Sequence, residues 1–117
     1  IPHWCLTIAL EENGEITAGV TYDPIRDEMF RVEKGGPAFL RNKRLQVSGW
    51  RNLKDAMIAG SLPNLHQVKS DPLKQALYPL LEATHCFRSS GSAALDLAYV
   101  AAGRYDGYFE VMLKPWD

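Results

Sequence analysis

The dipeptide Asn13-Gly14 constrains the fold of this chain more than any other short feature of the sequence. Asn and Gly tolerate the positive φ angles of a type I′ turn, and such a pair between alternating segments is the strongest local signal of a two-residue β-hairpin. Apolar residues alternate with polar or small ones over 6–10 before the turn and over 16–22 after it. A period of two is typical of a half-buried strand. We therefore predict an antiparallel hairpin at the start of the chain.

The rest of the first half continues as a β-meander, because short apolar segments alternate with breaks and show no helical period. Asp23 and Pro24 begin the first break: proline presets φ for a turn, and the aspartate side chain can accept hydrogen bonds from its own turn. The expected strands cover 29–33, 38–40 and 45–47, and the breaks between them cover 23–27, 35–37 and 41–44.

The second half changes to alternating strands and helices. A helix is expected to begin near Asp71 and Pro72, and Pro79 is expected to kink or divide it. The strongest helix covers 92–102, where small and apolar residues form a broad face, and Gly103 provides the stop. The remaining predicted strands are 56–60, 85–88 (a strand or a connector) and 105–111. Together the two halves predict a mixed α/β or α+β fold built from layers.

The composition is that of an ordinary globular chain, with 46% hydrophobic and 23% charged residues among 117. Its 13 basic and 14 acidic residues give a net charge of −1, which argues against a general nucleic-acid or membrane-surface binder. No apolar run approaches the roughly 20 residues of a membrane-spanning helix. Cys5 and Cys86 are too few for a disulfide framework, so we expect two reduced, buried thiols in a cytoplasmic protein.

The two ends of the chain have an unusual character for a natural domain. The chain begins without Met inside a predicted strand and stops at Trp116-Asp117 without a polar tail. Domains usually begin and end in exposed, flexible segments. We therefore expect the chain to be part of a longer protein.

The Ser- and Gly-rich connector 88–94 leads into the strongest helix and is the first candidate binding site. The first turn of a helix has unpaired N–H groups and the positive end of the dipole, so it can receive an anion or a sugar hydroxyl. Gly91 would let a ligand approach the backbone closely. The alternative is a plain helix cap in which Ser90 accepts hydrogen bonds from the first-turn N–H groups.

Two carboxylates near the end of the chain are candidates for metal or substrate binding. Glu110 lies near the end of the last predicted strand, and Asp117 follows seven residues later. Carboxylates at strand ends can face a cleft, and Mg²⁺ prefers carboxylate oxygens. The alternative is that both are solvated surface groups. His3, His66 and His85 lack the close spacing of a zinc site, and the three tryptophans are expected to be core or interface residues.

Longer strings of residues resemble the inositol monophosphatase family. The segment 1–10 resembles the part of the family that follows its first metal motif, D-P-I-D-G-T, and 19–24 and 35–42 match its middle hairpins. The most specific strings are 91–104, 106–110 and 114–117. The resemblance covers the whole chain in order, is closest to bacterial members, and implies part of a layered αβαβα sugar-phosphatase fold.

The resemblance implies roles for five residues. Asp117 corresponds to a Mg²⁺ ligand of the family, and Glu110 corresponds to a glutamate that binds substrate hydroxyls. Gly91, Ser92 and Ala93 correspond to the helix opening that contacts the inositol ring or the phosphate. The family hydrolyses phosphate monoesters with a Mg²⁺-activated water and no covalent intermediate, and it commonly forms homodimers.

Important parts of the family pattern fall outside this sequence. The D-P-I-D-G-T motif, an upstream glutamate ligand and a water-positioning threonine precede Ile1 in the family, and a helix follows Trp-Asp. The resemblance thus implies that 1–117 is a partial domain with no catalytic residue of its own, and we expect it to be inactive alone. The string 23–27 looks like the metal motif, but Arg26 replaces the second aspartate, so we expect an ordinary turn there.

We interpret the chain as the central-to-C-terminal part of a cytoplasmic, Mg²⁺-dependent phosphatase acting on inositol monophosphate or a related polyol phosphate. Two alternatives stay open. One is a relative acting on fructose bisphosphate or a 3′-phosphoadenosine nucleotide, and the other is a non-catalytic scaffold with the same fold. No nucleic-acid or membrane partner is inferred.

Overall fold

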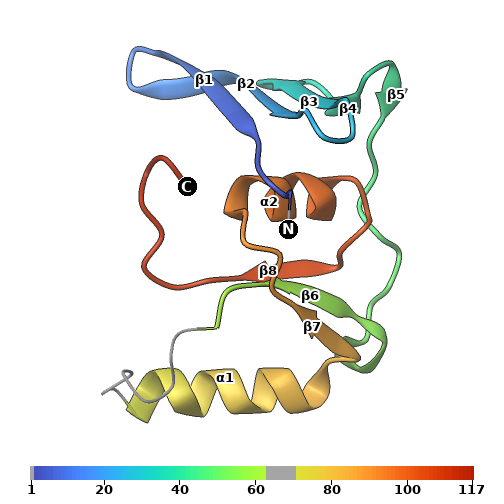
Figure 1. Ribbon diagram of the computed structural model, residues 1–117, viewed down its shortest axis with the longest axis vertical. Helices are drawn as coiled ribbons and strands as arrows, with labels where there is room; N and C mark the ends of the chain where they lie inside the picture. Colours follow the sequence, from blue (N-terminus) through green and yellow to red (C-terminus); the bar gives the residue numbers. More distant parts are fainter. Residues whose placement is uncertain (1, 63–70) are drawn as a thin grey trace.

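The computed structural model describes residues 2–62 and 71–117, and it stacks sheet and helix in four alternating layers (Figure 1). A five-stranded sheet forms one end, α2 (Ala93–Ala101) lies against it, a three-stranded sheet follows, and α1 (Asp71–Ala83) covers the far side. The strands are β1 (Leu6–Glu12), β2 (Glu15–Asp23), β3 (Glu28–Glu33), β4 (Phe39–Leu40), β5 (Lys43–Arg44), β6 (Met57–Gly60), β7 (Cys86–Arg88) and β8 (Gly107–Phe109). The predicted class, a mixed α/β fold in layers, is confirmed.

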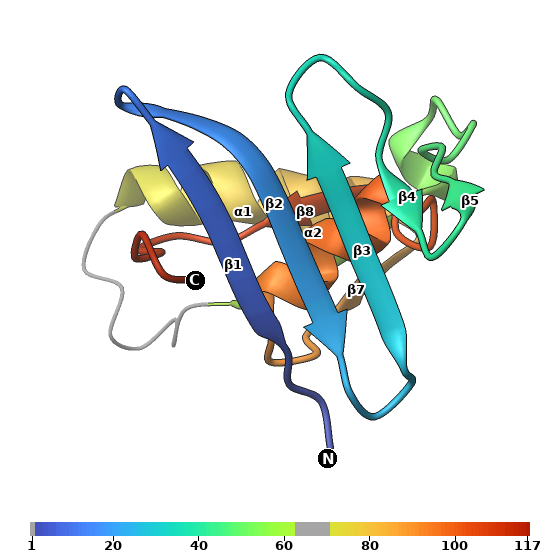
Figure 2. The same ribbon diagram turned by 90° about the horizontal axis from the view of Figure 1, so that it is seen from above.

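The first sheet is an antiparallel meander in the order β1-β2-β3-β4-β5, and Figure 2 shows its strands side by side over α2. Asn13 and Gly14 have φ angles of 54° and 80°, so the predicted two-residue hairpin is confirmed. Ile8 of β1 lies opposite Val20 of β2. Cross-strand partners share one face, and Phe30 on the opposite face is buried near α2, so the Ile8 face is the outer face of the sheet.

The second sheet is parallel, in the order β7-β6-β8. Parallel neighbours need long crossovers, and here α1 and α2 provide them. Gly60 of β6 lies opposite Phe109 of β8 with a φ of 149°, and a Cβ atom at Gly60 would lie 1.8 Å from the Phe109 carbonyl oxygen. Only glycine permits this approach of the two strands.

Helix α2 supplies the core between the two sheets and ends in a Schellman motif. Tyr99 is buried against Phe30 of β3. Gly103 has a φ of 70°, and its amide donates to the Val100 carbonyl at 3.0 Å, while the Arg104 amide donates to the Tyr99 carbonyl at 2.9 Å. The predicted stop at Gly103 is confirmed.

The prediction of a fifth strand over 45–47 is wrong. The structure places β5 at Lys43–Arg44, paired with β4 across a turn that uses only Arg41 and Asn42. Arg41 has a φ of 54°, which closes this turn within two residues. The strand therefore resumes two residues earlier than the polar segment 41–44 indicates.

Pro79 is expected to kink or divide a helix, and the second of these is wrong, because α1 continues without a break from Asp71 to Ala83. A kink at Pro79 stays a prediction. A proline removes one N–H group, here the partner of the Gln75 carbonyl. Both residues are exposed, so water can bind that carbonyl. A short 3₁₀ helix, Leu53–Asp55, was not predicted, since three residues are too few to show a period.

The cysteines and tryptophans are more exposed than the sequence predicts. Cys5 and Cys86 are free, but each is only partly buried. Trp4, Trp50 and Trp116 are 50%, 66% and 79% exposed, so none is a core residue, and the alternative of interface tryptophans stays a prediction. In the described part of the chain, no helix has the length and apolar character needed to span a membrane.

Candidate functional site

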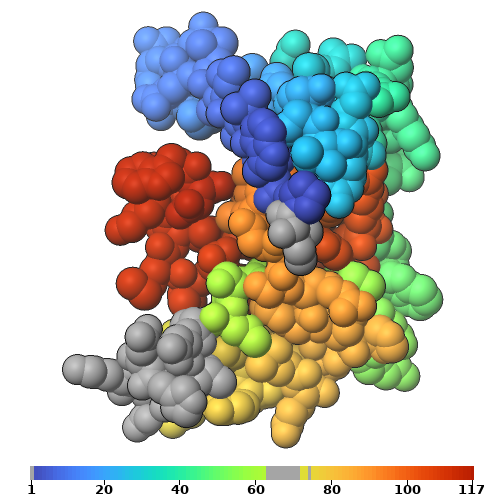
Figure 3. Space-filling view, in the orientation of Figure 1, coloured from blue at the N-terminus to red at the C-terminus, as the bar shows by residue number. Residues whose placement is uncertain are grey.

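A pocket of about 330 Å³ brings together four of the five residues that the sequence singled out. It lies where the start of the chain, the N-terminus of α2 and the C-terminal segment meet, and the space-filling view shows the C-terminal segment (red) beside α2 (orange) (Figure 3). Its lining residues are His3, Trp4, Cys5, Thr7, Gly91, Ser92, Ala93, Ala94, Trp116 and Asp117. Gly91, Ser92, Ala93 and Asp117 therefore share one cavity, although Ala93 and Asp117 are 24 positions apart in sequence.

The N-terminus of α2 opens onto this pocket without a side-chain cap. Ser92 is the N-cap residue in an extended conformation, and its side chain makes no capping hydrogen bond. The Ser90 hydroxyl instead donates to the Asp96 carboxylate at 2.6 Å, so the alternative of a plain cap by Ser90 is wrong. Gly91 has a φ of 93°, which turns the backbone into the helix. The first-turn N–H groups are therefore not taken by a capping side chain of this loop.

Asp117 lies at the edge of the pocket on a turn of the C-terminal segment. Its amide donates to the Lys114 carbonyl at 2.9 Å, and its Oδ2 accepts from the Lys114 amide at 2.6 Å. The side chain is exposed, so Oδ1 is available to a ligand. Within 2–62 and 71–117, no three His, Cys, Asp or Glu side chains form a metal-binding group. Asp117 could supply one carboxylate to a Mg²⁺ site, whose further ligands would be waters, phosphate oxygens and other carboxylates.

Glu110 follows directly after β8 and does not line this pocket. It accepts a hydrogen bond from the Tyr108 hydroxyl. Burial, and then the hydrogen bond to Glu110, raise the pKa of Tyr108, so the phenol stays protonated and remains a donor to the carboxylate. The strand and this bond together fix the direction of the Glu110 side chain.

The turn that imitates a metal motif is occupied by internal hydrogen bonds, as the sequence predicts. Asp23 is fully buried, and its Oδ1 accepts from the amides of Ile25 at 2.9 Å and Arg26 at 3.1 Å. Its Oδ2 accepts from the Arg26 guanidinium at 2.8 Å. Burial alone would raise the pKa of Asp23, but the hydrogen bonds from Arg26 and Ile25 outweigh it and lower the pKa. Asp27 is likewise paired, with Arg41 at 3.0 Å.

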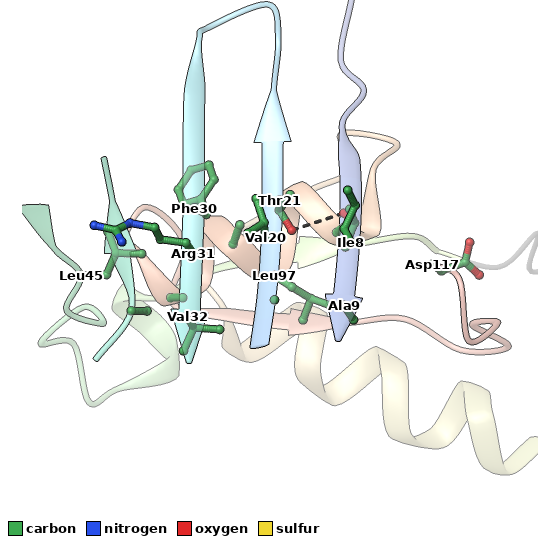
Figure 4. A pocket seen from close by; sticks show the side chains of 16 residues that line it. Ile8, Ala9, Val20, Thr21, Phe30, Arg31, Val32, Leu45, Leu97 and Asp117 are labelled. Carbon is green, nitrogen blue, oxygen red and sulfur yellow. Dashed lines mark hydrogen bonds between the residues drawn. The ribbon is translucent and has the colours of Figure 1, made fainter. Parts of the chain in front are cut away.

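A second cavity, of about 270 Å³, lies between the first sheet and α2 and was not predicted. Figure 4 shows apolar side chains from β1, β2 and β3 on one side, Leu97 of α2 on the other, and Asp117 at the edge. Ala94 and Ala98 of α2 line this space, and their short side chains fill little of it. The cavity offers few polar groups to a ligand, so the pocket at the helix N-terminus is the better candidate site.

Sequence reasoning missed the contribution of residues 3–7 to the candidate pocket. Cys5 contacts Ser92, with 3.6 Å between Sγ and Oγ, and Thr7 bonds Thr21 at 3.3 Å between their hydroxyl oxygens. The Nε2 atom of His3 is buried and has no hydrogen-bond partner among the described residues. None of these residues forms a motif with α2, which begins more than 80 positions later in sequence, so no local pattern could have shown them. His66 lies outside the described residues.

Comparison with known proteins gives one family. Residues 1–117 match the model of the Inositol monophosphatase family. An inositol-1-monophosphatase of Rhizobium meliloti is 42% identical over 117 residues, which are 100% of this chain and 44% of that protein. A Nus factor SuhB of Xylella fastidiosa is 40% identical over 116 residues, which are 99% of this chain and 42% of that protein. The chain spans less than half the length of these curated relatives.

Solved structures of such proteins share the fold. The extragenic suppressor protein suhB from Bartonella henselae has a TM-score of 0.89 and 44% identity over 99% of this chain and 44% of its own. An inositol monophosphatase from Anabaena has a TM-score of 0.86 and 38% identity over 99% of this chain and 46% of its own. SaIMPase-II with inositol monophosphate bound has a TM-score of 0.82 and 26% identity over 97% of this chain and 43% of its own.

Proposed function

Because the chain belongs to the inositol monophosphatase family, we propose that it is part of an enzyme that hydrolyses inositol monophosphate or a related polyol phosphate. The observation that carries the proposal is the single pocket shared by Gly91, Ser92, Ala93 and Asp117. A relative of known structure binds inositol monophosphate, which supports this substrate class. The motif resemblance drawn from the sequence is confirmed at the level of the family.

Asp117 is the residue that would hold Mg²⁺ in this pocket. A bound Mg²⁺ would polarise the phosphate and lower the pKa of an attacking water. The chain itself would contribute the N–H groups at the start of α2 and the Ser92 hydroxyl, which can donate to phosphate or sugar oxygens. Glu110, held by Tyr108, would accept a hydrogen bond from a substrate hydroxyl.

The remaining metal ligands and the water-positioning groups would come from parts of the protein outside residues 1–117. A single pocket carboxylate cannot hold Mg²⁺ tightly, since this ion needs several carboxylates or phosphates to replace its waters. We therefore propose that 1–117 is a partial domain and lacks phosphatase activity alone. A homodimer and a cytoplasmic location stay predictions.

The test is an assay of the complete protein on three substrates with and without Mg²⁺: inositol monophosphate, fructose bisphosphate and a 3′-phosphoadenosine nucleotide. We expect the highest kcat/KM on inositol monophosphate. A higher value on either other substrate would move the assignment to that class while keeping the phosphatase chemistry. Turnover that persists after chelation of Mg²⁺ would contradict the metal requirement.

A non-catalytic scaffold is the second candidate. The observation that favours it is that several relatives, in Xylella fastidiosa, Pasteurella multocida and Vibrio cholerae, are named Nus factor SuhB. A folded complete protein that turns over none of the three substrates, and whose sequence before Ile1 lacks the aspartates of the metal motif, would favour the scaffold.

A further inference from the structure

Asp96 is the most deeply buried carboxylate near the candidate pocket, and the proposed function does not use it. It lies in the first turn of α2, directly below the loop that carries Gly91 and Ser92, and is 2% exposed. Burying a carboxylate is costly unless it is hydrogen-bonded. Its environment therefore needs a structural reason.

Asp96 contacts the loop on both sides of Gly91. Its Oδ1 accepts the Ser90 hydroxyl at 2.6 Å, and its backbone amide donates to the Ser92 carbonyl at 3.0 Å. Gly91 lies between them with a φ of 93°. Glycine adopts many other φ values with similar energy, so this conformation needs neighbouring contacts to hold it. The bond to Ser90 is specific to the Asp96 side chain, whereas the amide bond to Ser92 is the first hydrogen bond of the helix and would form with any residue except proline.

The electrostatic environment agrees with this arrangement. Burial raises the pKa of Asp96, whereas the Ser90 hydrogen bond and the nearby His3 oppose the increase and Glu110 adds to it. A buried carboxyl oxygen needs a hydrogen-bond donor, and the Ser90 hydroxyl is the donor to Oδ1 of Asp96.

We propose that Asp96 is a positioning residue, which acts through Ser90 to hold the 90–93 loop in the conformation that presents its N–H groups and the Ser92 hydroxyl to the phosphate ester. Asp96 itself does not touch the substrate. This inference rests on the proposed function. The inference adds to the proposed function a residue that affects substrate affinity without lining the pocket.

The experiment compares Ser90→Ala, Ser90→Thr and Asp96→Asn in the complete protein, with inositol monophosphate as the substrate. Ser90→Ala removes the donor from a partly buried loop and leaves the core intact, so it should fold. We expect it to raise KM about tenfold with kcat within about twofold, because the loop must be ordered on each binding event. Ser90→Thr keeps the hydroxyl and should restore the wild-type KM. Asp96→Asn keeps an acceptor oxygen and should raise KM less than Ser90→Ala.

Ser48→Ala is the matched control, because it makes the same change at a partly buried serine that does not line the pocket. It should leave KM, kcat and the required Mg²⁺ concentration unchanged. An unchanged KM in Ser90→Ala, or no rescue by Ser90→Thr, overturns the positioning role. A wild-type protein that hydrolyses no phosphate ester refutes the proposed function instead, so the two failures are distinguishable.

Discussion

Asp117 and Glu110 should fail in different ways when each is neutralised in the complete protein. Asp117→Asn keeps the shape and removes a charge from the carboxylate that faces the pocket, so kcat should fall and the required Mg²⁺ concentration should rise. Glu110→Gln should spare the Mg²⁺ requirement and raise KM, because a hydrogen bond to a charged group contributes roughly 1.5–3 kcal/mol. A Mg²⁺ titration and a substrate panel on both variants check this. The reverse pattern would contradict the assigned roles.

Glu28 should make stability depend on acid pH through its pairing with Arg104. The Arg104 guanidinium donates twice to the Glu28 carboxylate, each time at 2.6 Å, and these hydrogen bonds lower the pKa of Glu28 below its ordinary value of 4.5, although burial opposes them. A lowered folded-state pKa means that the contribution is fully present above about pH 4.5 and is lost as pH falls through the folded value.

Glu28→Gln should therefore reduce the free energy of unfolding by about 1 kcal/mol at neutral pH, since the pair is partly exposed. The difference from wild type should shrink as the pH falls below 4, measured by urea unfolding of the complete protein. The exposed Glu11→Gln serves as the control. A difference that stays constant across this range would contradict the linkage.

At the scale of elements, the contact between β6 and β8 depends on Gly60. Gly60→Ala would bring Cβ to 1.8 Å from a backbone oxygen of Phe109 and would strain a φ of 149°. Because backbone atoms cannot move aside cheaply, we expect a loss of more than about 3 kcal/mol in the free energy of unfolding. Gly49→Ala, where no atom lies within 4 Å, should change stability by less than about 1 kcal/mol. If both substitutions changed the free energy of unfolding by similar amounts, the close contact between β6 and β8 at Gly60 would be contradicted.

Elements with a local signal were predictable from the sequence, and elements set by tertiary contacts were not. The Asn13-Gly14 hairpin and the Gly103 stop follow from φ preferences of single residues, and both are confirmed. Ser90 was a plausible cap by type, but the buried Asp96 competes for its hydroxyl. The link between residues 3–7 and the start of α2 could not be predicted, because only the stacking of the first sheet on the helix creates it.

At the scale of the whole molecule, no described element covers the outer apolar face of the first sheet. Leu6, Ile8, Leu10, Ile16 and Met29 are between 44% and 73% exposed. The register places Leu6, Ile8 and Leu10 on the outer face, and β1 is an edge strand with unpaired backbone groups. We expect the isolated 117-residue chain to self-associate at micromolar concentration.

Sedimentation velocity can test this expectation. Ile8→Glu should reduce the associated fraction, because it places a charge within the apolar face. Val47→Glu, at a residue that is 70% exposed outside the strands, should not change it. A wild-type chain that sediments as a monomer and unfolds in one sharp cooperative transition would contradict the prediction.

The difference in topology between the two sheets has a kinetic consequence. Every pair in the first sheet joins strands that are neighbours in sequence, whereas β6 must find β8 across the whole of α1, β7 and α2. Closing such long loops costs chain entropy before any contact forms, and structures with distant pairings fold slowly. During refolding of the complete protein, amides of β1 to β3 should gain protection from hydrogen exchange before those of β6 and β8. The central strand β6, which ends at Gly60, would then be among the last strands to form stable hydrogen bonds. During synthesis, the emerging chain would therefore expose a paired first sheet before the second sheet has formed.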